Sequence, residues 1–193
     1  MTTRRAILLL AILTGLARAA SAQEYPKAEI SLGYSYLYDD SFDGTDVSGS
    51  FPLGWMASVN FNVNSWLGIV ADVSGSYKSE NTVMDINLDE GFDFSVHGLH
   101  GGFRISGHKS QSATPYVQAL AGVTRGSVGS SVAGVGVAVS ETDFSFQPGL
   151  GVIVRLSDSI GIDLGGDYRM VFSEGVTTNE FRAHGGIVFR LGR

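Results

Sequence analysis

The residues of this chain that are best suited to acid–base or covalent chemistry are its 4 histidines and its serines. A histidine next to a serine can act as a general base, provided that an acidic group orients it. The histidines are scattered along the sequence, and no nucleophile, base and orienting acid can be assembled from their spacing. The chain has 0 cysteines, which excludes a cysteine nucleophile, a disulfide and a zinc–thiolate site. We therefore expect no catalytic residues and no enzymatic activity.

Metal binding is the second chemistry that these residue types allow. His97 and His100 are three positions apart, which in a strand places them on opposite faces unless a bulge intervenes. Two acidic groups could bind calcium or bridge lipid phosphates through divalent ions, namely Asp39, Asp40, Asp43 and Asp46, and Asp85, Asp89, Glu90 and Asp93. Neither group has a regular ligand spacing, so solvated loop charge is the favoured interpretation. The sequence predicts no metal site and no cofactor.

A third set of charged residues carries more information, because its members alternate with apolar residues. They have both signs and fall on the polar face of strand-like segments, so a closed sheet would bring them together in one interior. A barrel of about eight strands has an interior only wide enough for side chains to fill. Buried charges are tolerated there only if they are paired. We expect a hydrogen-bonded ion network of Glu29, Asp72, Arg155, Asp163, Asp167, Arg169, Glu180, Arg182, His184 and Arg190.

The elements that must hold these charges are clearest in residues 144–191. Apolar residues occupy every second position from 144 to 156, apart from Pro148, and again from 160 to 172 after a break at 157–159. The last strand repeats the pattern, with Phe181, Ile187 and Phe189 on one face and charged residues on the other. The charged face does not suit the core of a soluble protein, and the apolar face is too long for its surface. Strands that face lipid outward and a polar lumen inward explain both faces.

The chain begins with a pattern typical of an export signal. Arg4 and Arg5 precede an apolar run over residues 6–17, and small residues at 20–22 precede a predicted cut before Gln23. The run is shorter than the roughly 20 residues that span a bilayer. We therefore predict a signal peptide over 1–22 and one barrel domain over 23–193. Removing 1–22 takes away three arginines and no acid, which changes the formal charge from −6 to −9 and disfavours nucleic acid as a partner.

The sequence after the signal contains no run of 18 apolar residues, so in a membrane this chain must form a closed barrel. Alternation predicts eight strands, at 27–38, 51–61, 66–77, 92–105, 114–125, 144–156, 160–172 and 180–191. In the fourth strand the apolar residues change parity near His97, which predicts either a bulge or a second half that points differently. In the fifth, the face with Val117 and Val123 is expected to point outward.

The connections between these strands alternate in length. Links 62–65, 106–113 and 157–159 are short, whereas those near 39–50, 78–91, 126–143 and 173–179 are mostly long and rich in Gly, Ser and acids. Outer-membrane barrels have an even strand number, short periplasmic turns and longer external loops. The pattern therefore predicts an all-β, eight-stranded, antiparallel up-and-down transmembrane barrel with both ends of the barrel domain on the short-turn side.

Several segments resemble a known family. These are residues 145–152 (SFQPGLGV), the turn 155–159 (RLSDS), the triplet 167–169 (DYR), the closing 181–189 (FRAHGGIVF) and 114–118 (TPYVQ). They resemble the small outer-membrane β-barrel domains related to outer membrane protein A and its short relatives. The resemblance implies location in the outer membrane of a Gram-negative-type bacterium, surrounded by its lipids. The closing strand also resembles the signal read by the barrel-assembly machinery, although this chain continues past Phe189 to Gly192 and Arg193.

Lipid A deacylases share this architecture and carry a His-x-Ser pair near the outer leaflet. In this chain only His108 and Ser110 have that spacing, and they lie in a predicted short turn, so the resemblance does not extend to catalysis. Two function classes remain: a monomeric barrel with a filled polar lumen that contacts an unidentified surface ligand through its loops, and a narrow pore for small solutes or ions. A soluble barrel of the lipocalin type would need the opposite arrangement, with an apolar inside and a polar outside.

Overall fold

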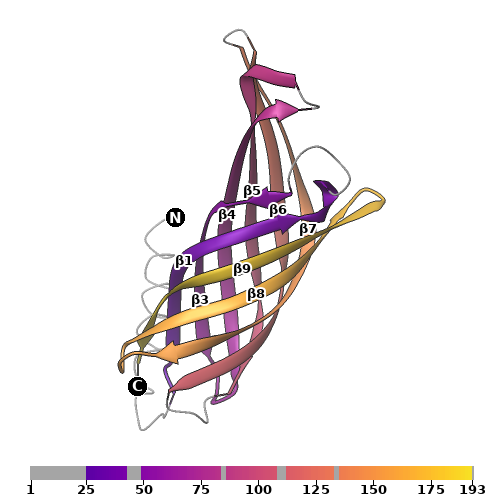
Figure 1. Cartoon of the computed structure of the whole chain (residues 1–193). Helices are drawn as coiled ribbons and strands as arrows, with labels where there is room; N and C mark the ends of the chain where they lie inside the picture. The colour runs from indigo at the N-terminus through magenta and orange to yellow at the C-terminus, as the bar shows by residue number, and fades with distance from the viewer. Residues whose placement is uncertain (1–24, 43–48, 84–85, 108–111, 133–134, 193) are drawn as a thin grey trace, which may run out of the picture.

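The structure is a computed structural model of the whole chain, and it describes residues 25–42, 49–83, 86–107, 112–132 and 135–192 (Figure 1). The predicted signal peptide, residues 1–22, lies outside the described part. The described elements are β1 (Ala28–Asp39), the short 3-10 helix η2 (Asp40–Phe42), β2 (Ser50–Phe51), β3 (Leu53–Asn62), β4 (Leu67–Val83), β5 (Ile86–Ser106), β6 (Ala113–Val132), β7 (Val135–Arg155), β8 (Ile160–Ser173) and β9 (Val176–Leu191). No helix in these ranges is long and apolar enough to cross a membrane.

The strands form one closed antiparallel sheet. Their order is β2-β1-β3-β4-β5-β6-β7-β8-β9, and β1 also pairs with β9 along its whole length, from Ala28 opposite Leu191 to Asp39 opposite Glu180. β2 is a two-residue piece that pairs with β1 just before Pro52, and β3 then continues along the same neighbour. The eight long strands therefore close as the alternation of the sequence predicts.

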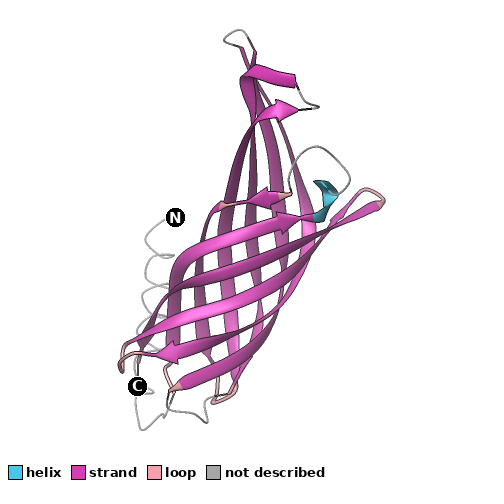
Figure 2. Cartoon of the chain, viewed as in Figure 1, coloured by secondary structure: helices cyan, strands magenta, loops and turns pink. Residues whose placement is uncertain are grey.

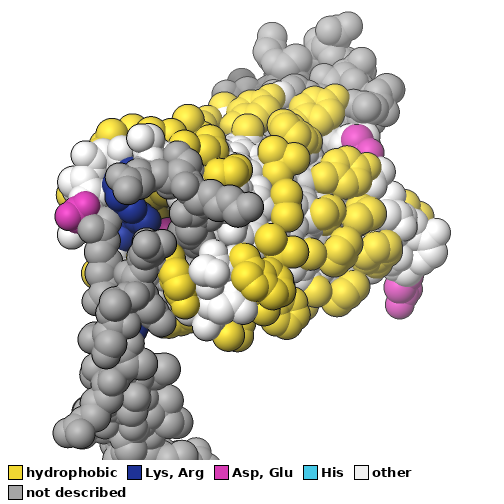
Figure 3. Space-filling view, turned by 90° about the horizontal axis from the view of Figure 1, so that it is seen from below, with side chains coloured by type: hydrophobic (Ala, Val, Ile, Leu, Met, Phe, Trp, Pro, Cys, Tyr) yellow, Lys and Arg dark blue, Asp and Glu magenta, His cyan; other side chains and the backbone are white. Residues whose placement is uncertain are grey.

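Side chains alternate between the outer wall and the interior. On β8, Ile162, Leu164 and Tyr168 are exposed, whereas Asp163 and Asp167 are almost fully buried. Figure 3 shows the hydrophobic side chains spread over the outer wall of the barrel. This wall is apolar because successive residues of a strand point to opposite faces, and the sequence places apolar residues at every second position. On β6, Val117 and Val123 point outward as expected.

The fourth long strand, β5, keeps a regular register past the position where its apolar residues change face. Its pairing with β4 is continuous from Ile105 to Phe92, so there is no bulge near His97. The strand instead carries Leu99 and Phe103 on the outer wall and Val96 in the interior. Val96 belongs to an interior apolar cluster with Leu37, Phe51 and the partly buried Phe94. The parity changes because the external end of the interior is itself apolar.

Two of the expected long loops are largely strand. β4 and β5 pair as far as Val83 opposite Ile86, and β6 and β7 pair as far as Val132 opposite Val135. The neighbouring strands stop earlier, since β3 pairs with β4 only to Tyr77 and β8 pairs with β7 only to Phe144. The ends of β4–β7 therefore project well beyond the barrel (Figure 2). The prediction of loops at 78–91 and 126–143 was wrong because small residues and acids in these segments still pair along extended backbones.

Candidate functional site

The charged interior is centred on Arg182, which β9 directs into the barrel. Its guanidinium donates from Nη1 to Asp72 Oδ1 (3.0 Å) and from Nη2 to Asp72 Oδ2 (3.2 Å), and Asp72 lies on β4, which is not a neighbour of β9. It also donates from Nε and Nη2 to Asp167 Oδ2, at 3.0 and 2.8 Å. Asp167 is directly opposite Arg182 on β8. One arginine thus holds two carboxylates on two walls, with planar geometry suited to both.

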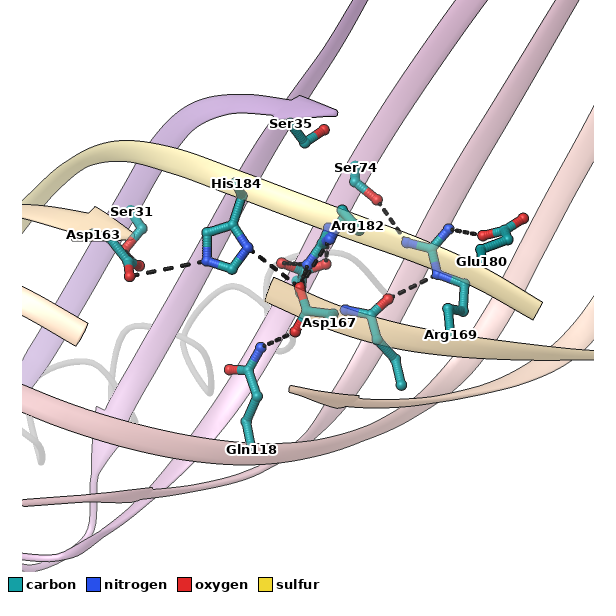
Figure 4. A network of polar contacts seen from close by, with 12 residues as sticks. Ser31, Ser35, Ser74, Gln118, Asp163, Asp167, Arg169, Glu180, Arg182 and His184 are labelled. Carbon is teal, nitrogen blue, oxygen red and sulfur yellow. Dashed lines mark hydrogen bonds and ion pairs between the residues drawn. The ribbon is translucent and has the colours of Figure 1, made fainter. Parts of the chain in front are cut away.

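Asp167 extends this network toward β6. Gln118 donates from Nε2 to Asp167 Oδ1 (2.8 Å), and Arg104 on β5 donates to Gln118 Oε1 from Nη2 (2.8 Å). The Arg104 guanidinium also lies 3.9 Å from the centre of the Tyr116 ring. His184 Nδ1 is 3.3 Å from Asp167 Oδ2. Neutral side chains therefore link charged residues that strand pairing alone does not bring together (Figure 4).

Asp163 forms a second node closer to the short-turn end. It accepts hydrogen bonds from Tyr116 Oη on Oδ1 and from Ser31 Oγ on Oδ2, both at 2.8 Å. The Tyr116 hydroxyl is also 3.2 Å from His184 Nε2. β1, β6, β8 and β9 thus meet at this carboxylate. The node stabilises the interior through hydrogen bonds to a charged acceptor, which are stronger than neutral ones.

Arg169 forms the third node, toward the projecting strands. It donates from Nη1 to Glu180 Oε2 (2.9 Å), which is its cross-strand partner on β9. It also donates from Nε to Gln147 Oε1 (2.8 Å) and from Nη2 to Ser74 Oγ (3.2 Å). β4, which carries Ser74, lies on the opposite side of the barrel from β8. The side chain of Arg169 is 1% exposed, so these contacts are made away from solvent.

The remaining predicted residues lie at the short-turn end. Glu29 accepts a hydrogen bond from Asn60 Nδ2 (3.0 Å) and lies 3.7 Å from Arg190 Nε. Arg155 is only half-buried, and within the described residues its guanidinium makes no hydrogen bond or ion pair. The structure therefore brings together the predicted residues in three nodes and one outlying pair, and it places Arg155 apart from them.

Comparison with known proteins gives the family. A model of the family described as "Outer membrane protein beta-barrel domain" matches residues 6–189, which is nearly the whole chain. The chain belongs to this family. It is an outer-membrane β-barrel, located in the outer membrane of a Gram-negative bacterium. Among curated proteins, none matches its sequence.

Solved structures of the same shape support the assignment of the fold. Neisserial surface protein A (NspA) superposes with a TM-score of 0.62 at 13% identity, covering 86% of this chain and 97% of that one. Ail, the attachment invasion locus protein of Yersinia pestis, gives 0.58 at 16% identity, covering 86% and 99%. Ail in complex with the heparin analogue sucrose octasulfate also gives 0.58, at 17% identity, with the same coverage. At identities this low, the superpositions show that this outer-membrane β-barrel shares their fold, and they show nothing more.

Sequence reasoning missed several interior residues of this outer-membrane β-barrel. Arg104, Gln118 and Gln147 are buried and bonded to the nodes, yet they were not among the predicted residues. The signal for Arg104 was present, because it lies between outward Phe103 and Ile105. The two glutamines were missed because an uncharged residue on a polar face does not by itself indicate a partner.

One histidine–serine pair is present in the interior of this outer-membrane β-barrel. His100 Nε2 is 2.7 Å from Ser145 Oγ, and Thr124 Oγ1 donates to the same serine oxygen (2.9 Å). Ser145 is fully buried. His97, three positions away, points to the outer wall and contacts the Tyr77 hydroxyl. Among the described residues, no three His, Asp or Glu side chains are grouped closely enough to hold a metal ion.

Proposed function

We propose that this outer-membrane β-barrel acts as a monomer with a closed lumen, and that the projecting ends of β4–β7 contact a partner outside the cell. It performs no catalysis, and the barrel-assembly machinery inserts it. The observation that carries the proposal is the Arg182 node, in which a buried guanidinium spans from β9 to β4 and ties Asp72 to Asp167. These side chains, bonded across the interior, support a lumen closed to water and ions.

The projecting strands support the surface role. They extend past the last residues of β3 and β8 that pair with the barrel wall, so they stand clear of the membrane. Val139 is 70% exposed there, and its cross-strand partner Val128 is 40% exposed. The surface role rests on the length of these projecting strands, on which such apolar side chains are available to a partner. Because the mature chain carries a formal charge of −9 under the predicted cleavage, a polyanion is disfavoured as that molecule.

Single-channel conductance in planar bilayers tests the closed lumen. The wild-type protein should give no steady ion current, because the three nodes are bonded across the interior. The double variant Asp72→Ala, Arg182→Ala removes the guanidinium that crosses the interior together with its carboxylate partner on β4, and it should give measurable current if it folds. Steady current through the wild type would contradict the closed lumen and favour the alternative, a narrow pore for small solutes or ions.

Shortening one projecting hairpin tests the surface role separately. Replacing residues 127–140 by a two-residue turn should leave the barrel folded, which heat-modifiable gel mobility reports. Bacteria that express this variant should adhere less to an epithelial cell layer than bacteria that express the wild type. The Glu174→Gln variant, altered in the short β8–β9 turn, is the matched control. Equal adherence of all three would contradict a role for the projecting strands.

A further inference from the structure

A cavity of about 290 Å³ opens at the external mouth of the barrel, between the Arg169 node and the projecting strands. Its floor includes Glu180 and Thr124, both buried, and Glu180 is held from below by Arg169. Residues of β1, β5, β6, β7, β8 and β9 line it, so it belongs to the barrel and not to one hairpin. Its volume is near the lower end of the range for small-molecule sites.

One part of the cavity wall is apolar. Phe51, Phe94, Val96 and Val171 line it, and Phe51 and Val96 belong to the apolar cluster of the upper interior. The buried Lys78 makes cation–π contacts with two of these rings: its Nζ lies 5.3 Å from the Phe51 ring centre and 5.2 Å from that of Phe94. The wall is therefore supported by neighbouring side chains and is suited to the apolar part of a ligand.

The rest of the wall is acidic. Asp39, Glu141, Asp143 and Glu180 line the cavity, and among the described lining residues none is Lys, Arg or His. Glu180 is neutralised by Arg169, and Asp39 accepts a hydrogen bond from the Ser41 amide (2.9 Å). Glu141 and Asp143 make no ion pair with any described residue, although the exposed Arg125 is close by and donates to Ser140 (2.7 Å). Arg169 and the buried Lys78 thus act on Glu180 and Asp39, whereas no lining cation balances the charge of Glu141 and Asp143.

We propose that this mouth cavity binds a small organic cation, with an ammonium or guanidinium group against Glu141 and Asp143 and an apolar body against Phe51, Phe94 and Val171. Charge complementarity selects the cation. The half-buried Asp143 attracts a positive group more strongly than a fully solvated carboxylate does, and the exposed Glu141 adds to the negative charge of the cavity mouth. The apolar wall selects an organic cation over a bare metal ion, which would gain nothing from the phenylalanine rings. The site goes beyond the proposed surface role. Its floor is the Arg169–Glu180 pair, so it does not depend on whether the lumen is closed at the Arg182 node.

Calorimetric titration of phenethylammonium into the full protein in lipid nanodiscs tests this site, with empty nanodiscs as the reference. We expect saturable binding, with much weaker binding of the neutral analogue 2-phenylethanol. The double variant Glu141→Gln, Asp143→Asn should weaken binding by about tenfold, as expected for the loss of two partly exposed ion pairs. The matched control is Glu174→Gln, which removes an exposed charge at the same end of the barrel but outside the cavity, and it should bind as the wild type does.

Several outcomes would overturn the site. Equal weakening in the double variant and in Glu174→Gln would show diffuse attraction to an acidic surface. Equal binding of phenethylammonium and 2-phenylethanol would remove the role of the carboxylates. Calcium that binds the wild type and displaces phenethylammonium at equal concentration would assign the carboxylates to a metal ion. The variant Val171→Phe, which fills the cavity without changing its charge, should also abolish binding, and unchanged binding by a folded Val171→Phe protein would place the ligand elsewhere.

Discussion

Arg182 and Asp72 are 110 positions apart in sequence and lie on strands that are not neighbours, yet they share two hydrogen bonds inside the barrel. The contact is bidentate, which fixes the angle between the two side chains as well as their distance. Asp167 occupies the remaining edge of the same guanidinium. The three residues therefore connect the β8–β9 side of the wall to β4 through the interior.

The outer wall predicts a clear difference between two arginine substitutions. Leu164 is 49% exposed on the lipid-facing side of β8, so Leu164→Arg should destabilise the folded protein in lipid by about 2 to 4 kcal/mol. Val176 is 65% exposed at the start of β9, beside the external turn, and Val176→Arg should cost about 0 to 1 kcal/mol. Urea titration in lipid vesicles measures both. Similar costs for the two variants would mean that Leu164 does not face lipid.

The seam between β1 and β9 predicts a steric effect. A methyl group on Gly186 would overlap Leu32 O and lie 2.8 Å from Gly33 Cα, whereas one on Gly126 would meet nothing within 4 Å. Overpacking of this kind costs about 1 to 3 kcal/mol, so Gly186→Ala should lower the midpoint of unfolding and Gly126→Ala should leave it nearly unchanged. Heat-modifiable gel mobility follows closure. A Gly186→Ala barrel as stable as the Gly126→Ala control would argue against close packing at the seam.

The predicted signal peptide leads to a defined mature N-terminus. Mass spectrometry of protein isolated from outer membranes should give a chain that begins at Gln23, because Ala20 and Ala22 supply the small residues that a signal peptidase needs. Substituting leucine for both alanines should retain the segment and slow export. An isolated protein that still begins at Met1 would contradict the prediction.

The sequence was sufficient to predict the barrel because the alternation of apolar and polar residues can be read from each strand separately, without knowledge of its neighbours. Alternation within one strand decides which residues face lipid, and it correctly placed Leu164 outside and Asp167 inside. The same rule failed at the external end of β5, where Val96 is apolar and yet faces inward. Alternation assigns a residue to a face but cannot say that the top of the interior is apolar, since this depends on residues contributed by β1 and β2.

The partners inside the barrel could be predicted only in part. Asp167 with Arg182 and Arg169 with Glu180 are direct cross-strand pairs, which the expected order of strands already made neighbours. The contacts of Arg182 with Asp72 and of Arg169 with Ser74 span the lumen, and they depend on the stagger of strands that closure sets. The crowding inside the barrel could not be predicted from the sequence either. A Cβ on Gly165 would lie 2.6 Å from His184 Nε2, so a side chain as small as that of serine would disturb this lumen-facing position.

The stability of Arg182→Ala tests the central claim, a dry interior held by paired charges, most directly. Removing the Arg182 guanidinium would leave the Asp72 and Asp167 carboxylates buried without the cation that pairs with both. This should cost on the order of 3 to 5 kcal/mol. The exposed Arg125 is the matched control, and Arg125→Ala should cost roughly 0 to 1 kcal/mol. The measurement is the free energy of unfolding in detergent by reversible urea titration. A loss below about 1 kcal/mol for Arg182→Ala, equal to that of the control, would mean that water screens the interior charges, and it would contradict the closed lumen.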